Sequence, residues 1–273
     1  MIKDIFVNLS LDEEDVTDAY AVSFAKLFKA QLHAKAFAWI PVYPSTAPMA
    51  SSSADFIARE RAANKKRADA AVSRFRNAAA ASGLIAHART VDATVAEASR
   101  MLGETARHFD IVVVGQGKPD HWAPEILIEG ALFGCGRPVL VVPYIQRDPM
   151  MLRHVTVCWD GSRAAARAIG DAIPLLRHAE SVDLLSVSTG QEAKAIDGSM
   201  KEHLVRHGVK AVTRQVEGTK IGEVPAILNH VAETSSDLIV MGGYGHARLR
   251  EFVLGGVTRG ILASMTAPVL MSH

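Results

Sequence analysis

The chain has 273 residues, 49% hydrophobic and 22% charged, and its 30 Lys and Arg against 29 Asp and Glu give a formal net charge of +1 at pH 7. This length exceeds the roughly 100 to 200 residues of one domain and predicts either two modest domains or one large α/β domain. The near-neutral charge argues against nucleic acid or an anionic membrane as the main partner, and no apolar run approaches the roughly 18 residues of a membrane span.

The first half of the chain alternates strand-like and helix-like segments. Its apolar runs predict strands at 4–9, 32–40, 84–91, 110–115 and 138–143. Prolines and serines within an insertion at 41–64 predict a loop, followed by a charged helix over 54–82. Thr94 and Glu97 have the spacing of a capping box, which predicts the start of a helix that ends near His108.

The second half shows the same alternation. Apolar runs predict strands at 154–160, 182–188, 209–216, 237–242 and 267–272. Helix-period segments between them predict helices at 163–179, 193–207, 222–235 and 255–265. Alternating strands and helices of this kind favour a parallel sheet with helices on both faces.

Two segments of the first half recur in the second. The run from Asp110 to Gly115 recurs from Asp237 to Gly242, and the Pro-Val-Leu segment at 138–140 recurs at 268–270. We therefore predict two tandem α/β domains, 1–147 and 148–273, each a doubly wound, five-stranded parallel sheet. Ligands of such sheets bind outside the carboxyl ends of the strands, where the strand order reverses.

A glycine-rich stretch follows the fourth strand of the second half. Gly242, Gly245 and Gly255 would let main-chain N–H groups approach an anion, and Gly256 opens a predicted helix whose first turn includes Thr258. A helix start offers unpaired N–H donors and the positive end of the dipole, which together suit a phosphate. In the alternative interpretation, Gly242 only ends a strand, and Gly255 and Gly256 allow close helix packing.

The spacing Gly242-x2-Gly245-x9-Gly255 resembles the nucleotide-binding signature of the universal stress protein family. The segment from Val157 to Ser162 resembles that family's first strand and its Asp-Gly-Ser turn. Because the likeness extends over both halves, the chain is similar to tandem members of the family, whose fold is that of the adenine nucleotide alpha hydrolases.

The resemblance implies a role for each matching position. Asp160 would hydrogen-bond the ribose, and Val187 and Met241 would contact the adenine ring. The phosphates would be held by the glycines and the helix start, at Gly242, Gly245, Gly255, Gly256, Val257 and Thr258. Gly256 stands where the family pattern has Ser or Thr, so one side-chain donor is missing. The alternative for Asp160 is a turn or helix-capping residue.

The first half departs further from the family pattern. Gly115-Gln-Gly117 lacks a glycine at the third step, and the loop that follows is shorter than its counterpart. Glu129 and Gly130 are interpreted as the remnant of the helix start, where a carboxylate would repel phosphate. We therefore predict that this half does not bind nucleotide in the family's way.

Other reactive side chains give weaker signals. His203 and His207 are four apart on a predicted helix but lack a third ligand, so we interpret them as exposed helix residues and predict no metal site. Cys158 lies in an apolar strand and should be inert, whereas Cys135, between two glycines, should be more exposed. The two thiols are too few for a disulfide framework and suggest a cytoplasmic protein.

The resemblance implies a regulatory protein of the stress response that binds ATP or a related adenine nucleotide, with any Mg²⁺ brought by the nucleotide, in its C-terminal domain. Any ATPase activity should be slow, because the sequence offers no evident base, metal cluster or nucleophile. The two domains should pack as an internal pseudo-dimer, and fifth-strand edges can pair two chains. The alternatives are a nucleotide-free scaffold, or a carrier of a small apolar ligand in the N-terminal domain beneath the 41–64 insertion.

Overall fold

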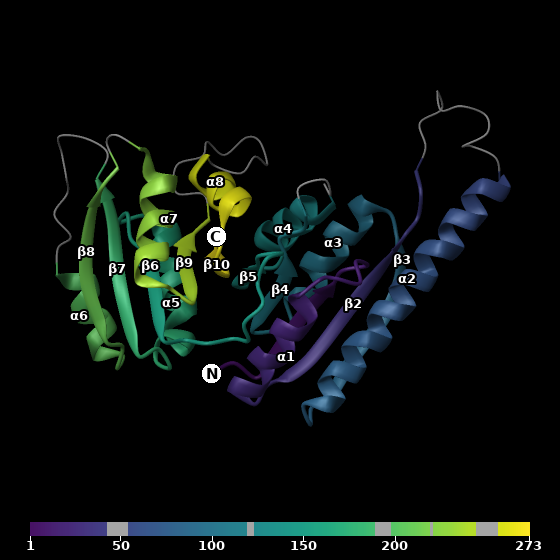
Figure 1. Ribbon diagram of the computed structural model, residues 1–273, viewed down its shortest axis with the longest axis horizontal. Helices are drawn as coiled ribbons and strands as arrows, with labels where there is room; N and C mark the ends of the chain where they lie inside the picture. The colour runs from purple at the N-terminus through teal and green to yellow at the C-terminus, as the bar shows by residue number, and fades with distance from the viewer. Residues whose placement is uncertain (43–53, 119–122, 189–197, 219–220, 244–255) are drawn as a thin grey trace. The chain divides into compact units, whose positions relative to one another are not determined.

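The structure is a computed structural model that describes residues 1–273 except 43–53, 119–122, 189–197, 219–220 and 244–255 (Figure 1). The chain forms two compact units, Ile2–Cys135 and Gly136–His273, with Met1 grouped in the second. None of the helices within the described ranges combines the length and the apolar character needed to cross a bilayer.

The first unit is a parallel sheet with helices on both faces. Its described strands lie in the order β3–β2–β1–β4. Helices α1 and α2 pack together, as do α3 and α4, and α2 runs along β2 and β3 (Figure 1). The elements are β1 Asp4–Leu9, α1 Thr17–Phe28, β2 Gln31–Trp39, α2 Ala54–Ala81, β3 Ala86–Ala93, α3 Val95–Ala106, β4 Ile111–Gly115 and α4 Ala123–Gly134.

The second unit contains the order β5–β10–β9–β6–β7–β8 among its described strands. All of these pairs are parallel except β5 with β10. The elements are β5 Val139–Val142, β6 His154–Cys158, α5 Arg163–Leu176, β7 Ser181–Ser188, α6 Ser199–Arg206, β8 Ala211–Glu217, α7 Glu223–Thr234, β9 Leu238–Gly242, α8 Gly256–Ser264 and β10 Val269–Ser272.

The predicted α/β class and its parallel, helix-covered sheets are confirmed, but the fifth strand of the first half is placed differently. Strand β5 pairs antiparallel with β10, with Val141 opposite Val269, and all four of its residues are buried. These contacts group β5 with the second unit, so the compact units divide between Cys135 and Gly136, ahead of the predicted boundary between 147 and 148.

The repeated aspartate ties neighbouring strands together at their amino ends. One carboxylate oxygen of Asp110 accepts the main-chain N–H groups of Lys3 at 2.6 Å and Asp4 at 3.1 Å. In the second unit, Asp237 accepts those of Arg153 at 2.8 Å and His154 at 3.0 Å. The same residue therefore aligns β4 with β1 and β9 with β6.

Three glycines allow helices α3 and α4 to cross closely. A Cβ atom on Gly103 would lie 2.8 Å from the Gly130 carbonyl oxygen and 2.9 Å from the Cα of Gly134. The helix that carries Gly103 begins with the predicted capping box, in which Thr94 and Glu97 each accept the other's main-chain N–H. Cap and crossing together fix α3 against the sheet and α4.

The glycine crossing can be tested with Gly103→Ala. The added Cβ would overlap main-chain atoms, so we expect the free energy of unfolding to fall by about 1–3 kcal/mol. Gly170→Ala, on an exposed helix position with nothing within 4 Å, should instead raise it by about 0.5–1 kcal/mol. Urea denaturation followed by circular dichroism measures both, and a neutral or stabilising Gly103→Ala would contradict the crossing.

Asp237 gives a pH-dependent prediction. Burial acts to raise the pKa of Asp237, but hydrogen bonds from the Arg153 guanidinium and from two main-chain N–H groups outweigh it and hold the pKa below its ordinary value of 3.8. The stability that the carboxylate contributes is therefore complete above that value and is lost as the pH falls through the folded-state pKa. Asp237→Asn should lower the free energy of unfolding by about 1.5–3 kcal/mol at pH 7.

The difference between Asp237→Asn and wild type should shrink below pH 3.8, as measured by urea denaturation at several pH values. Asp171→Asn is the matched control, because it removes a carboxylate from an (i,i+4) ion pair with Arg167 and should cost at most about 0.5 kcal/mol. A loss for Asp237→Asn that is the same at pH 3 and pH 7 would show that its charge is not the cause.

Candidate functional site

The strand order of the second sheet reverses between β9 and β6. From β6 the chain proceeds to β7 and β8 on one side, while β9 and β10 lie on the other. Ligands of open α/β sheets bind at the carboxyl ends of the two strands that flank such a switch point. Asp160 lies two residues after β6, and Gly242 is the last residue of β9, so the structure brings these two predicted site residues to the same end of adjacent strands.

The turn after β6 is held by its own side chains. Asp160 Oδ1 accepts the Ser162 N–H at 2.8 Å, Gly161 adopts a φ of 77°, and Ser162 Oγ accepts the Ala165 N–H at 3.1 Å to cap α5. The turn interpretation of Asp160 is therefore confirmed. Because Asp160 is also exposed, its carboxylate remains accessible at the switch point.

Gly242 is required by packing. A Cβ atom there would lie 2.5 Å from the Ala165 nitrogen and 2.6 Å from the Ala164 carbonyl carbon, closer than real side chains come. Gly242 also ends β9, as its alternative interpretation had it, and its lack of a side chain lets the first turn of α5 lie against the end of that strand. The next residue, Gly243, donates its N–H to the Ser272 carbonyl at 2.8 Å.

Helix α8 begins at Gly256, as predicted. Gly256 is exposed, and a Cβ atom there would meet nothing within 4 Å, whereas Thr258 is only 4% exposed. The start of α8 therefore presents mainly main-chain N–H groups. Met241 is buried and Val187 is partly exposed, near the ends of β9 and β7. Gly245 and Gly255 lie outside the described residues.

Of the two free cysteines, Cys135 is buried and Cys158 is partly exposed. Burial, together with the nearby Asp160 carboxylate, raises the pKa of the Cys158 thiol to about 12, which agrees with its predicted inertness. Cys135 is only 6% exposed, so the expectation that it would be accessible is wrong. It is the last residue of its compact unit and directly follows α4, and the flanking glycines did not reveal its burial.

The corresponding end of the first sheet carries carboxylates. Lys118 pairs with Asp12 at 2.8 Å and with Glu14 at 2.9 Å. Asp18 is 4% exposed, and burial together with the charge of Asp15 raises its pKa to about 7, against the lowering effect of Arg74. Such a concentration of acidic groups opposes phosphate binding.

The predicted helix start at Glu129 and Gly130 is wrong. Helix α4 runs from Ala123 to Gly134, so both residues lie in its interior. Gly130 serves the crossing with α3, where an added Cβ would lie 2.7 Å from the Ser99 carbonyl oxygen. A glycine that permits helix contact was thus mistaken for one that opens a helix.

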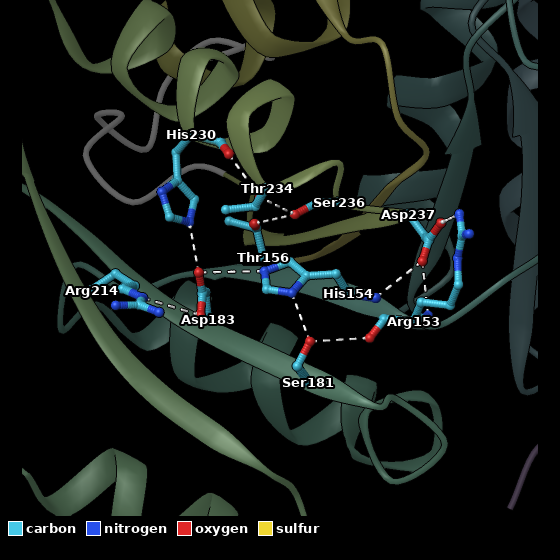
Figure 2. Close-up of polar contacts among 10 residues, drawn as sticks. All are labelled: Arg153, His154, Thr156, Ser181, Asp183, Arg214, His230, Thr234, Ser236 and Asp237. Atoms are coloured by element: carbon cyan, nitrogen blue, oxygen red, sulfur yellow. Dashed lines mark hydrogen bonds and ion pairs between the residues drawn. The ribbon is translucent and has the colours of Figure 1, made fainter.

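A buried polar cluster around Asp183 was not foreseen from the sequence (Figure 2). Asp183 is 3% exposed, and its Oδ2 lies 3.0 Å from His230 Nε2 and 3.4 Å from His154 Nε2. Its Oδ1 lies 3.4 Å from Arg214 Nε. The isolated acidic residue within the apolar strand 181–188 was the available signal, but its partners come from β6, β8 and α7.

In the Asp183 cluster, the carboxylate is paired with basic side chains of the same cluster. A neighbouring chain of hydroxyls runs from Thr156 to Ser236 at 2.7 Å and on to Thr234 at 2.9 Å (Figure 2). Within the described part of the chain, no three His, Cys, Asp or Glu side chains are placed to hold a metal ion. We therefore assign the cluster a structural role under α7.

Comparison with known proteins agrees with this geometry. Residues 151–273 match the sequence model of the universal stress protein family. These residues are therefore similar to universal stress proteins. Universal stress protein YxiE of Bacillus subtilis is 27% identical over 150 residues, which cover 44% of this chain and 99% of that protein.

Two further relatives are similar to this chain beyond its second half. Universal stress protein Slr1230 of Synechocystis is 26% identical over 174 residues, and the match covers 59% of this chain and 57% of that relative. The crystal structure of a universal stress protein from Archaeoglobus fulgidus DSM 4304 superposes with a TM-score of 0.72 at 18% identity. It covers 98% of this chain and 95% of that one, so the fold of that protein extends over both halves of this chain.

Proposed function

We propose that the second half of this chain binds ATP or a related adenine nucleotide, and that the bound state alters its association with partners in a cytoplasmic stress response. The observation that carries the proposal is the placement of Asp160 and Gly242 on either side of the strand-order switch point. The match of residues 151–273 to the universal stress protein family supports a nucleotide as the ligand.

The proposed contacts follow from the arrangement of the described residues. The exposed Asp160 carboxylate would accept hydrogen bonds from the ribose hydroxyls. Val187 and Met241 would supply apolar surface for adenine. The phosphates would lie at the start of α8, where N–H groups at Gly256, Val257 and Thr258 precede the first intrahelical bonds. Gly242 would contribute main-chain contacts, and Gly245 and Gly255 stay predictions.

The same arrangement predicts slow ATP hydrolysis. Among the described residues that we place at the switch point, Asp160 already holds a turn, Ser162 caps α5 and Thr258 is buried. The others are glycines and apolar side chains. Phosphoryl transfer depends on positioned charge and a placed water. Mg²⁺ would arrive with the nucleotide and would be coordinated by its phosphates.

Asp160→Asn separates the ribose role of this residue from its role in the turn. The Asn side-chain oxygen can still accept the Ser162 N–H, so the turn should survive, while the charge that favours ribose hydroxyls is lost. We expect ATP to bind about tenfold more weakly. Binding of 2′,3′-dideoxy-ATP, which lacks those hydroxyls, should be unchanged. Calorimetry measures both, and equal effects on the two nucleotides would refute the ribose contact.

Gly256→Ser tests the departure from the family pattern. The open space at Gly256 can accommodate the side chain, and its hydroxyl would donate to phosphate at the start of α8. ATP should bind about five- to tenfold more tightly. Gly198→Ser adds the same hydroxyl at the start of α6, also in open space, and should leave affinity unchanged. Wild type and Gly256→Ser both failing to bind millimolar ATP would instead favour a nucleotide-free scaffold.

A further inference from the structure

The first unit contains a cavity of about 390 Å³ on the face of its sheet near α3. That volume falls in the range of small-ligand sites, roughly 300 to 1,000 Å³. Strands β1, β2 and β3 and the end of α3 line it, and the side chains that matter below are Phe6, His33, Lys35, His87, Arg89 and Phe109. All of them lie within the described part of this unit.

Flat rings form much of the cavity wall. Phe6 and Phe109 stack with ring centroids 5.1 Å apart, and the His33 ring lies 5.0 Å from Phe109. His33 also stacks on His87, with centroids 5.0 Å apart. Four rings in succession offer an extended surface for a flat, apolar ligand.

A buried ammonium lies beside these rings. Lys35 is 5% exposed, its Nζ donates to Thr105 Oγ1 at 2.5 Å, and the same nitrogen lies 6.0 Å from the centroid of Phe6. Within the described residues, no carboxylate lies at ion-pair distance from this ammonium. A buried charge without a counter-ion is costly, and an anionic ligand would relieve that cost.

Neighbouring charges make the cavity more favourable to an anion. Burial lowers the pKa of Lys35, and Arg89 lowers it further, against the weaker opposing effect of Glu104, which itself pairs with Arg100. Burial also lowers the pKa of His33, and His87 adds to this against a smaller effect of Asp4. At Lys35 the effect of the cationic Arg89 outweighs that of the acidic Glu104.

The second unit has an acidic residue at the position that corresponds to His33. In the strand register, Phe6 lies opposite His33 in the first unit, and Thr156 lies opposite Asp183 in the second. Because the repeated aspartates bind equivalent residues of β1 and β6, His33 corresponds to Asp183. By the same register, Arg89 corresponds to Arg214. In the second unit the Asp183 carboxylate pairs with Arg214, whereas in the first unit the residue that corresponds to Asp183 is His33.

We infer that the first unit binds a small organic acid with a flat apolar body, whose carboxylate pairs with Lys35 and Arg89 and whose body lies on the rings of Phe6, His33, His87 and Phe109. The ligand carboxylate would then supply the negative charge that Asp183 supplies in the second unit. This site differs from the alternative raised from the sequence, a small apolar ligand beneath the 41–64 insertion, and it does not depend on nucleotide binding by the second half.

The test uses 2-naphthoate as the probe and full-length protein. Calorimetry should show binding of 2-naphthoate and at least about tenfold weaker binding of the neutral 2-naphthamide. Lys35→Met should weaken 2-naphthoate binding by a similar factor and leave 2-naphthamide unaffected. Lys66→Met removes the same charge from the exposed surface of α2 and should change neither. Equal affinity of wild type and Lys35→Met for 2-naphthoate would overturn the inference.

Two further measurements keep the inference falsifiable if Lys35→Met folds poorly. Arg89→Gln alters an exposed residue of β3, should keep the wild-type melting temperature, and should weaken 2-naphthoate binding severalfold. Nuclear magnetic resonance should show 2-naphthoate shifting the ring protons of His33 and His87, with saturating ATP present. Unmoved His33 and His87 signals, or unchanged affinity in Arg89→Gln, would place the probe elsewhere and reject the site.

Discussion

The aspartate that precedes β4 and again precedes β9 determines where the ends of the central strands meet. Each carboxylate receives two main-chain N–H groups of the adjacent strand's beginning, which fixes the relative register of β1 with β4 and of β6 with β9. Parallel strands of similar length that start together also end together. The alignment of Asp160 with Gly242 at the opposite edge of the sheet is therefore a consequence of a bond made at its amino ends.

The duplicated halves keep this scaffold but place different chemistry on it. At the carboxyl ends of the strands, the second unit offers glycines and a helix start, whereas the first has Lys118 paired with acidic residues and Asp18 buried nearby. On the face covered by α3 in the first unit and by α7 in the second, the distribution of charge is the opposite. The second unit there balances Asp183 with basic partners, whereas the first gathers basic and aromatic side chains around a cavity. Duplication has thus produced two different surfaces at each equivalent location.

Much of the fold could be predicted from the sequence, because buried strands and capped helices are local patterns. The apolar runs 110–115 and 237–242 and the Thr94–Glu97 cap are examples. The pairing of β5 with β10 could not be predicted, because an apolar run does not reveal its partner. The roles of individual glycines were also hard to assign from the sequence. Gly242 and Gly130 serve close packing with segments distant in sequence, and only their neighbours in space distinguish this from a turn or a helix start.

Because β5 pairs antiparallel with β10, a fragment that contains the second half needs residues that precede the family match. The family match begins at residue 151, but the strand that covers the outer edge of β10 lies at 139–142. A fragment cut at the start of the family match would leave the main-chain groups on that edge without partners, and an uncovered edge recruits other strands into aggregates. A fragment that keeps the edge of β10 covered must therefore include β5, and the compact unit that contains β5 begins at Gly136.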